Sequence, residues 1–450
     1  MVQKHESLAL LGAGVFDGLH EEIFENQAVL IRNQRIERIV PMQDYHRDPE
    51  YREIPLDGHW VMPGMIDCHV HLSGGRASVE EQELGLVSEP MLMRAIRSVY
   101  EAQAVLKRGF TAARDVSWNG LYLKRMFFEG VMPGPKVIAC GPGLSRTGGH
   151  GDMFQFTEEY TKSHAVWGLM ADGPEEVRKG VRRLLREGAD QIKVWASGGD
   201  NWPHDRMGDV HYSAEELKMI VEEAHRQTGT GVMCHAENRE SIKLALDAGV
   251  DTIEHGESLD EELVEQMKRQ GTILIPTLEL IVNWYRDFIP LSEDGPQSKI
   301  RPDTFLYRDL YLCRDHDFGR GYSQSAVDSF QLAVESGVKI GLGSDTVFEP
   351  LTRYGEYSAR EYKALNQHGM TKFQALHAGT KVSSEAVGMA DFIGTLEPGK
   401  LADLLVLRAN PLEDIDAFYD EANIHMVLTD GRIAVQDGAL LWGDPNRTAV

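Results

Sequence analysis

The stretch Pro63-Gly-Met-Ile-Asp-Cys-His-Val-His-Leu72 decides how the rest of the chain is interpreted. Its apolar residues, preceded by a Pro-Gly turn signal, predict a short buried strand. Because side chains alternate along a strand, His69 and His71 project from the same face. One histidine on a strand is more often a hydrogen-bonded core residue than a ligand. Two on one face, at the end of a buried strand, indicate a metal site.

Further candidate ligands stand at or near the ends of later strand-like runs, which alternate with helical patterns. In a (β/α)₈ barrel the catalytic groups gather at the C-terminal ends of the strands, so residues far apart in the sequence meet at one mouth. Neutral imidazoles and a carboxylate are donors that suit zinc or a similar divalent ion. A lysine that points into a barrel must lose its charge or find partners, and alone it indicates a buried ion pair or a snorkelling side chain. These later candidates are Lys193, His235, His255 and Asp345.

The hydrophobic patterning predicts an α/β fold with two parts. Residues 1–60 and 391–450 contain short alternating runs between turn residues, which are typical of antiparallel strands, and we expect both ends of the chain to form one small β-sandwich. Residues 61–390 alternate short apolar runs with amphipathic helices, which predicts a (β/α)₈ TIM barrel. Its strands are expected near 64–70, 110–115, 136–140, 190–196, 231–236, 251–255, 272–277 and 339–345.

Two local patterns refine this plan. Ser213-Ala-Glu-Glu216 has the spacing of a capping box and predicts a helix that runs to about Gln227. The stretch 279–325 is rich in aromatic residues and too long for a simple barrel loop, so we expect it to cover the mouth.

The composition argues against several kinds of partner. With 450 residues, 42% of them hydrophobic, the chain can bury one large core and a second, smaller one. Its 46 basic and 70 acidic residues give a formal charge of −24, which would repel nucleic acid and anionic lipid. No signal-peptide pattern and no run near ~20 apolar residues is present, so we expect a cytoplasmic protein. Without CxxC spacing, the thiols are expected to be reduced: Cys68, Cys140, Cys234 and Cys313.

Taken together, the motifs resemble those of the amidohydrolase superfamily. The matching segments are PGMIDCHVHL, QIKVWASGG, CHAEN, TIEHG and GLGSD, in family order, and EPGKLADLLVL where the chain re-enters the terminal strands. The resemblance covers essentially the whole chain. It is to the branch with a carboxylated lysine, which includes prolidase-like and carboxypeptidase-like dipeptidases and ochratoxin-hydrolysing amidases.

This resemblance implies a cofactor and a ligand set. Two divalent ions, zinc first among the candidates, would be bridged by Lys193 as a carbamate formed with CO₂. By the same resemblance, His69, His71 and Asp345 would hold the first ion. His235 and His255 would hold the second.

The resemblance also implies a reaction, the hydrolysis of a dipeptide or N-acyl amino acid amide by a hydroxide that bridges the ions. Asp345 would take a proton from the attacking water and return it to the leaving amine, unless it only ligates. His150, in Arg146-Thr-Gly-Gly-His-Gly-Asp152, would donate to the developing oxyanion. An exposed turn residue is an equally weighted interpretation of His150.

The substrate is a small-molecule amide whose identity is open. A substrate carboxylate would need an arginine, tyrosine or histidine at the mouth. Prolidase-like enzymes tend to carry a tyrosine shortly after His-Ala, whereas Glu237-Asn238 follow here, which argues against proline dipeptides. The candidates by loop position are His150, Arg146, Tyr212, Arg353 and Tyr354.

Two other functions compete with amide hydrolysis. A deaminase or a cyclic-amide, imidazolone-type ring hydrolase usually uses one metal and lacks the bridging lysine, so Lys193 argues against it. A scaffold that has lost catalysis would typically have lost ligands, whereas all six candidates are present. We also expect a homo-oligomer, because dimers and larger assemblies are common among similar enzymes.

Overall fold

The computed structural model describes residues 6–75, 89–153, 156–164, 167–199, 205–282, 316–347 and 352–441. Most of the stretch 279–325, expected to cover the mouth, lies outside these residues, as does Cys313. In the part of the chain that is described, no helix combines the length and the apolar character needed to cross a membrane.

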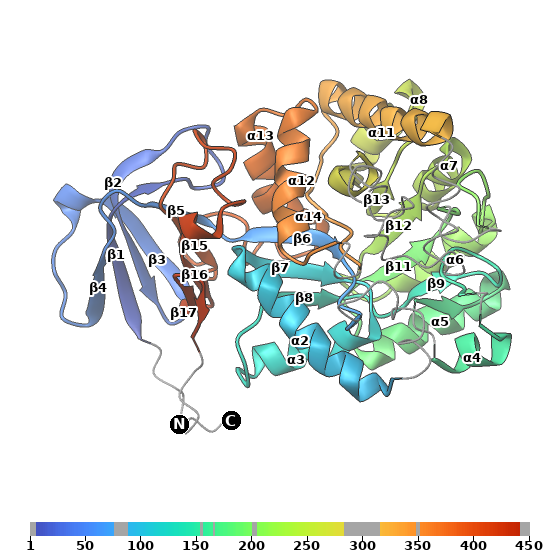
Figure 1. Ribbon diagram of the computed structural model, residues 1–450, viewed down its shortest axis with the longest axis horizontal. Coiled ribbons are helices and arrows are strands. Elements are labelled where there is room, and N and C mark those ends of the chain that lie inside the picture. Colours follow the sequence, from blue (N-terminus) through green and yellow to red (C-terminus); the bar gives the residue numbers. More distant parts are fainter. Residues whose placement is uncertain are drawn as a thin grey trace, which may run out of the picture.

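Segments from the two ends of the chain share one nine-stranded sheet, on the left of Figure 1. Its order is β18-β17-β16-β15-β5-β1-β2-β3, with β4 paired to β1. The strands are β1 Ser7–Val15, β2 Phe24–Arg32, β3 Arg35–Pro41, β4 Tyr51–Pro55, β5 Trp60–Pro63, β15 Leu404–Leu407, β16 Ile424–Thr429, β17 Arg432–Gln436 and β18 Ala439–Leu440. Short 3₁₀ turns cover Met42–Asp44 and Glu421–Asn423. The sandwich form and the boundaries near residues 60 and 390 stay predictions.

Strand β5 is the seam of this sheet. It runs parallel to β1, with Gly14 opposite Trp60, and antiparallel to β15, with Met62 opposite Leu405. The N-terminal and C-terminal segments therefore share one hydrogen-bonded ladder.

Parallel strands and helices fill the middle of the chain, on the right of Figure 1. The strands are β6 Met65–Val70, β7 Phe110–Asp115, β8 Lys136–Ala139, β9 Gly143–Ser145, β10 Gly168–Met170, β11 Ile192–Trp195, β12 Val232–Ala236, β13 Thr252–His255 and β14 Ile273–Ile275. The helices are α2 Met91–Lys107, α3 Trp118–Phe128, α4 Glu158–His164, α5 Gly173–Glu187, α6 Ala214–His225, α7 Arg239–Ala248, α8 Glu261–Gln270, α11 His316–Ser336, α12 Glu356–Gln367, α13 Lys372–His377 and α14 Ser383–Ala386. A π-helical turn, Ala378–Val382, joins α13 to α14.

These strands form two parallel sheets, ordered β6-β7-β8 and β10-β9-β11-β12-β13-β14. Residues 339–346 lie between β14 and β6. The Gly341 N–H donates to the Leu274 carbonyl at 2.9 Å, and the Cys68 N–H donates to the Leu342 carbonyl at 2.8 Å. The segment therefore joins the last strand of one sheet to the first strand of the other.

The expected strands up to 272–277 are present within a few residues, but two features differ from the prediction. Residues 339–345 form no regular strand, and the segment 339–346 has isolated bridges at Ile340 and Thr346 in place of a continuous ladder. Glycines in this run and the left-handed backbone of Asp345, with φ of 52°, interrupt regular pairing. Strands β9 and β10 were not expected, because three residues are too few to show an alternating pattern.

Helix α6 confirms the predicted capping box. The Ser213 hydroxyl accepts from the Glu216 N–H at 3.4 Å, and the Glu216 carboxylate accepts from the Ser213 N–H at 2.9 Å. The helix therefore begins where two of its unpaired backbone donors are satisfied.

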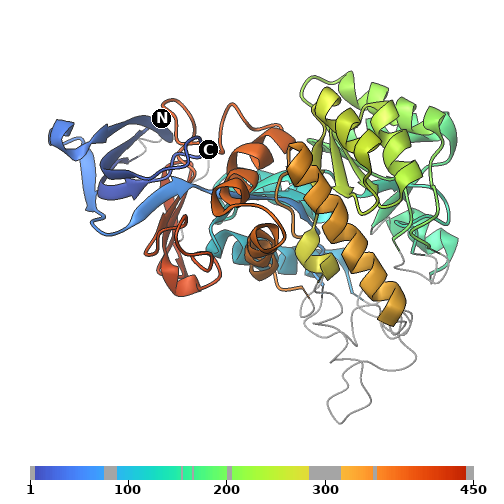
Figure 2. The same ribbon diagram turned by 90° about the horizontal axis from the view of Figure 1, so that it is seen from above.

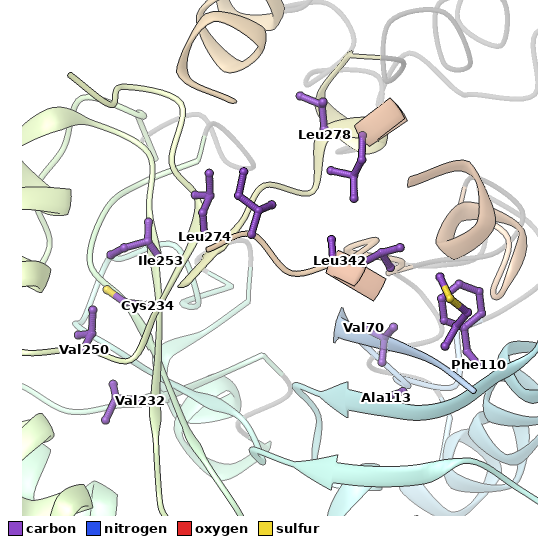
Figure 3. Packing of buried hydrophobic residues seen from close by; sticks show 14 of the residues in the cluster. Val70, Phe110, Ala113, Val232, Cys234, Val250, Ile253, Leu274, Leu278 and Leu342 are labelled. Atoms are coloured by element: carbon purple, nitrogen blue, oxygen red, sulfur yellow. The ribbon is translucent and has the colours of Figure 1, made fainter. Parts of the chain in front are cut away.

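The main hydrophobic core lies between the parallel strands and their helices. Figure 3 shows part of it, where Val70, Leu274 and Leu342 come from three neighbouring segments of the strands. The helices α12 and α13 lie between the parallel strands and the nine-stranded sheet (Figure 2). The ring of Phe373, on α13, meets the ring of Phe16, which follows β1, edge to face with the centroids 6.2 Å apart. The sheet is thus packed against the part that carries the site.

Candidate metal centre

The candidate ligands predicted from the sequence converge at the C-terminal ends of the parallel strands. His69 lies on β6, His71 follows directly after that strand, and Asp345 comes from the segment 339–346 beside it. The Asp345 Oδ1 atom lies 3.0 Å from His71 Nε2 and 3.5 Å from His69 Nε2. Lys193, from β11, places its Nζ 3.2 Å from His69 Nε2. These four side chains form the first half of the centre.

The second half is built by β12 and β13. The His235 and His255 rings meet with their centroids 4.6 Å apart, and the His255 ring lies 5.4 Å from that of His69. The buried Glu237 carboxylate joins them, with Oε1 3.5 Å from His235 Nε2. Each of two triads places its donor atoms within 4.8 Å of one another: His69, His71 and Asp345, and His235, Glu237 and His255. Sequence reasoning noticed Glu237 but did not count it among the donors.

Three of the histidines are oriented by a partner behind the ring. In each, Nδ1 faces an oxygen atom, so the Nε2 atom is the one directed at the centre. Such second partners are a common feature of histidines that ligate metals. The pairs are His69 with Glu254 Oε2 (2.9 Å), His71 with the Val116 carbonyl (3.1 Å) and His255 with Thr277 Oγ1 (2.7 Å).

The protonation states also fit a divalent ion. Burial lowers the pKa of His69 and of His235 well below the usual range, and lowers the pKa of His255 to about 4, so these imidazoles are neutral. Burial raises the pKa of Asp345, but the nearby His69 and His71 outweigh it and hold that pKa well below its usual range. Burial also lowers the pKa of Lys193, despite its acidic neighbours. Neutral imidazoles and an ionised carboxylate are the forms that bind metal.

Three residues around the centre have a left-handed backbone although none is glycine. The φ angles are 71° at His255, 47° at Thr277 and 52° at Asp345. Each such residue costs about 1–2 kcal/mol, and such conformations concentrate at functional sites. Next to the left-handed backbone of His255, the usual alternation of side chains is lost. Glu254 and His255 both face the interior.

The structure brings His150 to the centre. Its ring stacks on that of His235 with the centroids 4.4 Å apart, and its Nδ1 lies 2.6 Å from Asp205 Oδ2. Asp205 is buried and also has His211 Nε2 at 3.8 Å from its other oxygen. Sequence reasoning missed Asp205 and His211, because neither ends a strand and no spacing links them to His150.

The two tyrosines proposed as substrate contacts are buried, and their hydroxyls bind backbone carbonyl groups. Tyr212 is buried in the main core, and its hydroxyl donates to the Ala171 carbonyl at 3.1 Å. Tyr354 is also buried, and its hydroxyl donates to the carbonyl of His71 at 2.6 Å. Loop position alone does not indicate which way a side chain turns. The hydroxyls of Tyr212 and Tyr354 bind backbone carbonyl groups in this structure, and both substrate contacts stay predictions.

The two proposed arginines lie farther out. Arg353 has a side chain that is 68% exposed, with Nη1 3.6 Å from Glu356. Arg146 donates from Nη1 to the carbonyl of Thr147 at 3.1 Å. Neither contact directs a guanidinium at the candidate ligands, so both stay predictions.

Comparisons with known proteins agree with this geometry. The sequence profile of the amidohydrolase family matches residues 60–434. Ochratoxinase from Aspergillus niger is 31% identical over 461 aligned positions, which cover 98% of this chain and 89% of that protein. Its crystal structure superposes with a TM-score of 0.84 at 28% identity, covering 99% of each chain.

Two further relatives bear on the chemistry. The crystal structure of a prolidase in complex with N-methylphosphonate-L-proline superposes with a TM-score of 0.82 at 32% identity, covering 96% of this chain and all of that one. An imidazolonepropionase from Rhizorhabdus wittichii is 25% identical, covering 80% of this chain and 82% of that protein.

If the buried histidines hold metal, divalent ions will stabilise the fold, because a ligand that binds only the native state shifts unfolding by mass action. We expect zinc added to chelator-treated protein to raise the melting temperature, measured by differential scanning fluorimetry. His235→Ala should lose most of this increase. His377→Ala, which changes a histidine on α13 outside the centre, should keep it. An equal increase in both variants would contradict the site.

Proposed function

Because this chain belongs to the amidohydrolase family, we propose that it is a metal-dependent hydrolase that cleaves a carbon–nitrogen amide bond in a dipeptide or an N-acyl amino acid. The observation that carries the proposal is the convergence of Lys193 with the two donor triads at one end of the parallel strands. The proposal includes one closed (β/α)₈ barrel over residues 61–390, supported by the segment that joins β14 to β6, and a terminal sandwich.

The residues present fit two divalent ions, with zinc as the first candidate. In this proposal His69, His71 and Asp345 hold one ion, and His235 and His255 hold the other. When bound, such a pair supplies an acidified water and polarises the scissile carbonyl. Lys193 would bridge the pair as a carbamate. Its complete burial and lowered pKa support this, because the neutral amine is the form that reacts with CO₂.

Asp345 and His150 are the residues that would handle charge during the reaction. The Asp345 carboxylate, 3.0 Å from His71 Nε2, faces the centre and can accept a proton there and return it to the leaving nitrogen. Asp205 holds Nδ1 of His150, so Nε2 is the atom that would donate to the developing oxyanion. The stacking of His150 on His235 keeps that ring beside the centre.

Glu237 limits which part of a substrate can lie beside His235. A buried carboxylate beside His235 would disfavour a substrate carboxylate in the same place, since like charges repel more strongly away from water. It would favour a cationic or neutral group. In the proposed dipeptide or N-acyl amino acid, the substrate carboxylate would therefore lie away from Glu237, and a cationic or neutral part of the substrate would lie beside it.

The similarity to an imidazolonepropionase favours a second candidate, hydrolysis of a cyclic amide with one metal ion. Lys193 separates the two candidates, because only the binuclear reaction gives this buried amine a role at the centre.

The first test joins elemental analysis with substrate screening. Protein purified without chelator should contain about two divalent ions per chain and should hydrolyse members of a mixed panel of dipeptides and N-acyl amino acids. Released amines would be quantified by mass spectrometry. About one ion per chain, with no amide cleaved, would support the ring hydrolase and leave Lys193 as a structural residue.

The bridging role of Lys193 predicts a specific loss. Lys193→Ala should lose most bound metal and most activity, because both ions lose a shared ligand. Short carboxylic acids with bicarbonate should restore part of the activity. Lys243→Ala, on the surface of α7, serves as the control. Full activity with a full metal load in Lys193→Ala would refute the assignment.

Asp345→Asn tests proton transfer. The variant keeps the shape of the side chain but removes its basicity, so we expect kcat to fall by roughly 10²–10⁴-fold while KM changes little. Steady-state kinetics at a fixed metal load would measure the two constants. An unchanged kcat would remove Asp345 from this role.

A further inference from the structure

A charged pair lies in the interior of the parallel strands, directly behind the candidate centre. Arg114 on β7 and Glu254 on β13 both have fully buried side chains. The Nη2 atom of Arg114 lies 2.8 Å from Oε1 of Glu254. The interior of such strand arrangements is usually filled with branched apolar residues. Removing two charges from water costs free energy that their attraction only partly offsets. Stability alone is therefore a weak explanation for this pair.

Several strands hold the Arg114 guanidinium in place. Its Nε donates to the Cys68 carbonyl on β6 at 2.6 Å. Its Nη1 donates to Gln191 Oε1, just before β11, at 2.9 Å, and to Thr252 Oγ1 on β13 at 3.3 Å. A planar guanidinium bound on so many sides has one orientation. It can therefore fix the carboxylate that it binds.

That carboxylate faces a candidate ligand. Oε1 of Glu254 binds Arg114, and Oε2 lies 2.9 Å from Nδ1 of His69. Among the described residues neither of these two buried atoms forms a hydrogen bond of ordinary geometry, so the 2.9 Å ion-pair contact is the interaction that joins them. The left-handed backbone of His255 lets β13 place Glu254 behind His69 while His255 itself reaches the second half of the centre.

We propose that Glu254, anchored by Arg114, is a positioning residue for His69: it holds the ring with Nε2 directed at the first ion and increases the donor strength of that nitrogen. Glu254 also cancels the charge of Arg114, which would otherwise stand uncompensated behind a cation. The inference rests on the metal site of the proposed function, but not on the amide reaction.

The test measures zinc affinity by competition with a chromophoric chelator, beside far-ultraviolet circular dichroism and unfolding midpoints. Glu254→Gln keeps the size of the side chain but removes its charge. We expect it to bind one of the ions about 10–100-fold more weakly, as other changes behind a ligating histidine do. Asp403→Asn is the matched control, because this buried carboxylate pairs with Lys136 at 2.7 Å away from the centre. It should lower the midpoint and leave the affinity unchanged.

A second variant covers the case in which Glu254→Gln does not fold. Arg114→Met combined with Glu254→Leu replaces the pair with apolar groups, a change that buried ion pairs often tolerate. We expect this variant to fold and to show the same weakened zinc binding. Wild-type affinity in either folded variant would show that the pair is only structural and would overturn the proposal.

The same measurements separate this inference from the proposed reaction. If the wild-type protein binds zinc but cleaves no amide, and Glu254→Gln binds it more weakly, the positioning role stands and the proposed reaction fails. If the wild-type protein binds no divalent ion, both are refuted.

Discussion

The contact between residues 339–346 and strand β6 is the constraint on which the candidate centre depends. The Asp345 N–H donates to the His69 carbonyl at 2.8 Å, and the His71 N–H donates to the Thr346 carbonyl at 2.9 Å. These backbone bonds bring together residues almost three hundred positions apart in the sequence. The donor atoms of the carboxylate and the two imidazoles then lie within 4.8 Å of one another. The first half of the site is thus a product of strand pairing.

The centre also depends on backbone conformations that the rest of the fold must stabilise. His255, Thr277 and Asp345 are left-handed at the ends of neighbouring segments. Their combined cost is several kcal/mol, on the order of a domain's entire net stability. The extensive buried core of the strands and helices supplies the opposing free energy. The other described non-glycine residues with a left-handed backbone lie in the nine-stranded sheet and its turns: Asn26, Asn33, Gln34, Asp430 and Asp437.

The sequence predicted which strand-end residues meet, because residue type and spacing carry that information. It did not predict the residues that orient them. Asp205 meets His150 only through the folding of a polar loop. Strict alternation would direct His255 away from the face that Thr252 and Glu254 share, and the left-handed backbone of His255 departs from this alternation. The tyrosine hydroxyls turned to carbonyl groups because buried donors must be paired. The irregular last segment escaped prediction because its glycines and left-handed aspartate replace regular pairing.

The seam at β5 has a consequence for how the molecule is made. During synthesis β1 and β5 emerge early, but β15, the other neighbour of β5, emerges some three hundred and forty residues later. One edge of the early strands therefore waits, unpaired, while the intervening chain is translated, and such edges are prone to wrong pairing. Since only Gly64 separates β5 from β6, we expect the strand that carries His69 and leads into His71 to gain its final anchor only after β15 has been made. The candidate metal ligands at the end of β6 would then be fixed in place only when nearly the whole chain has been made.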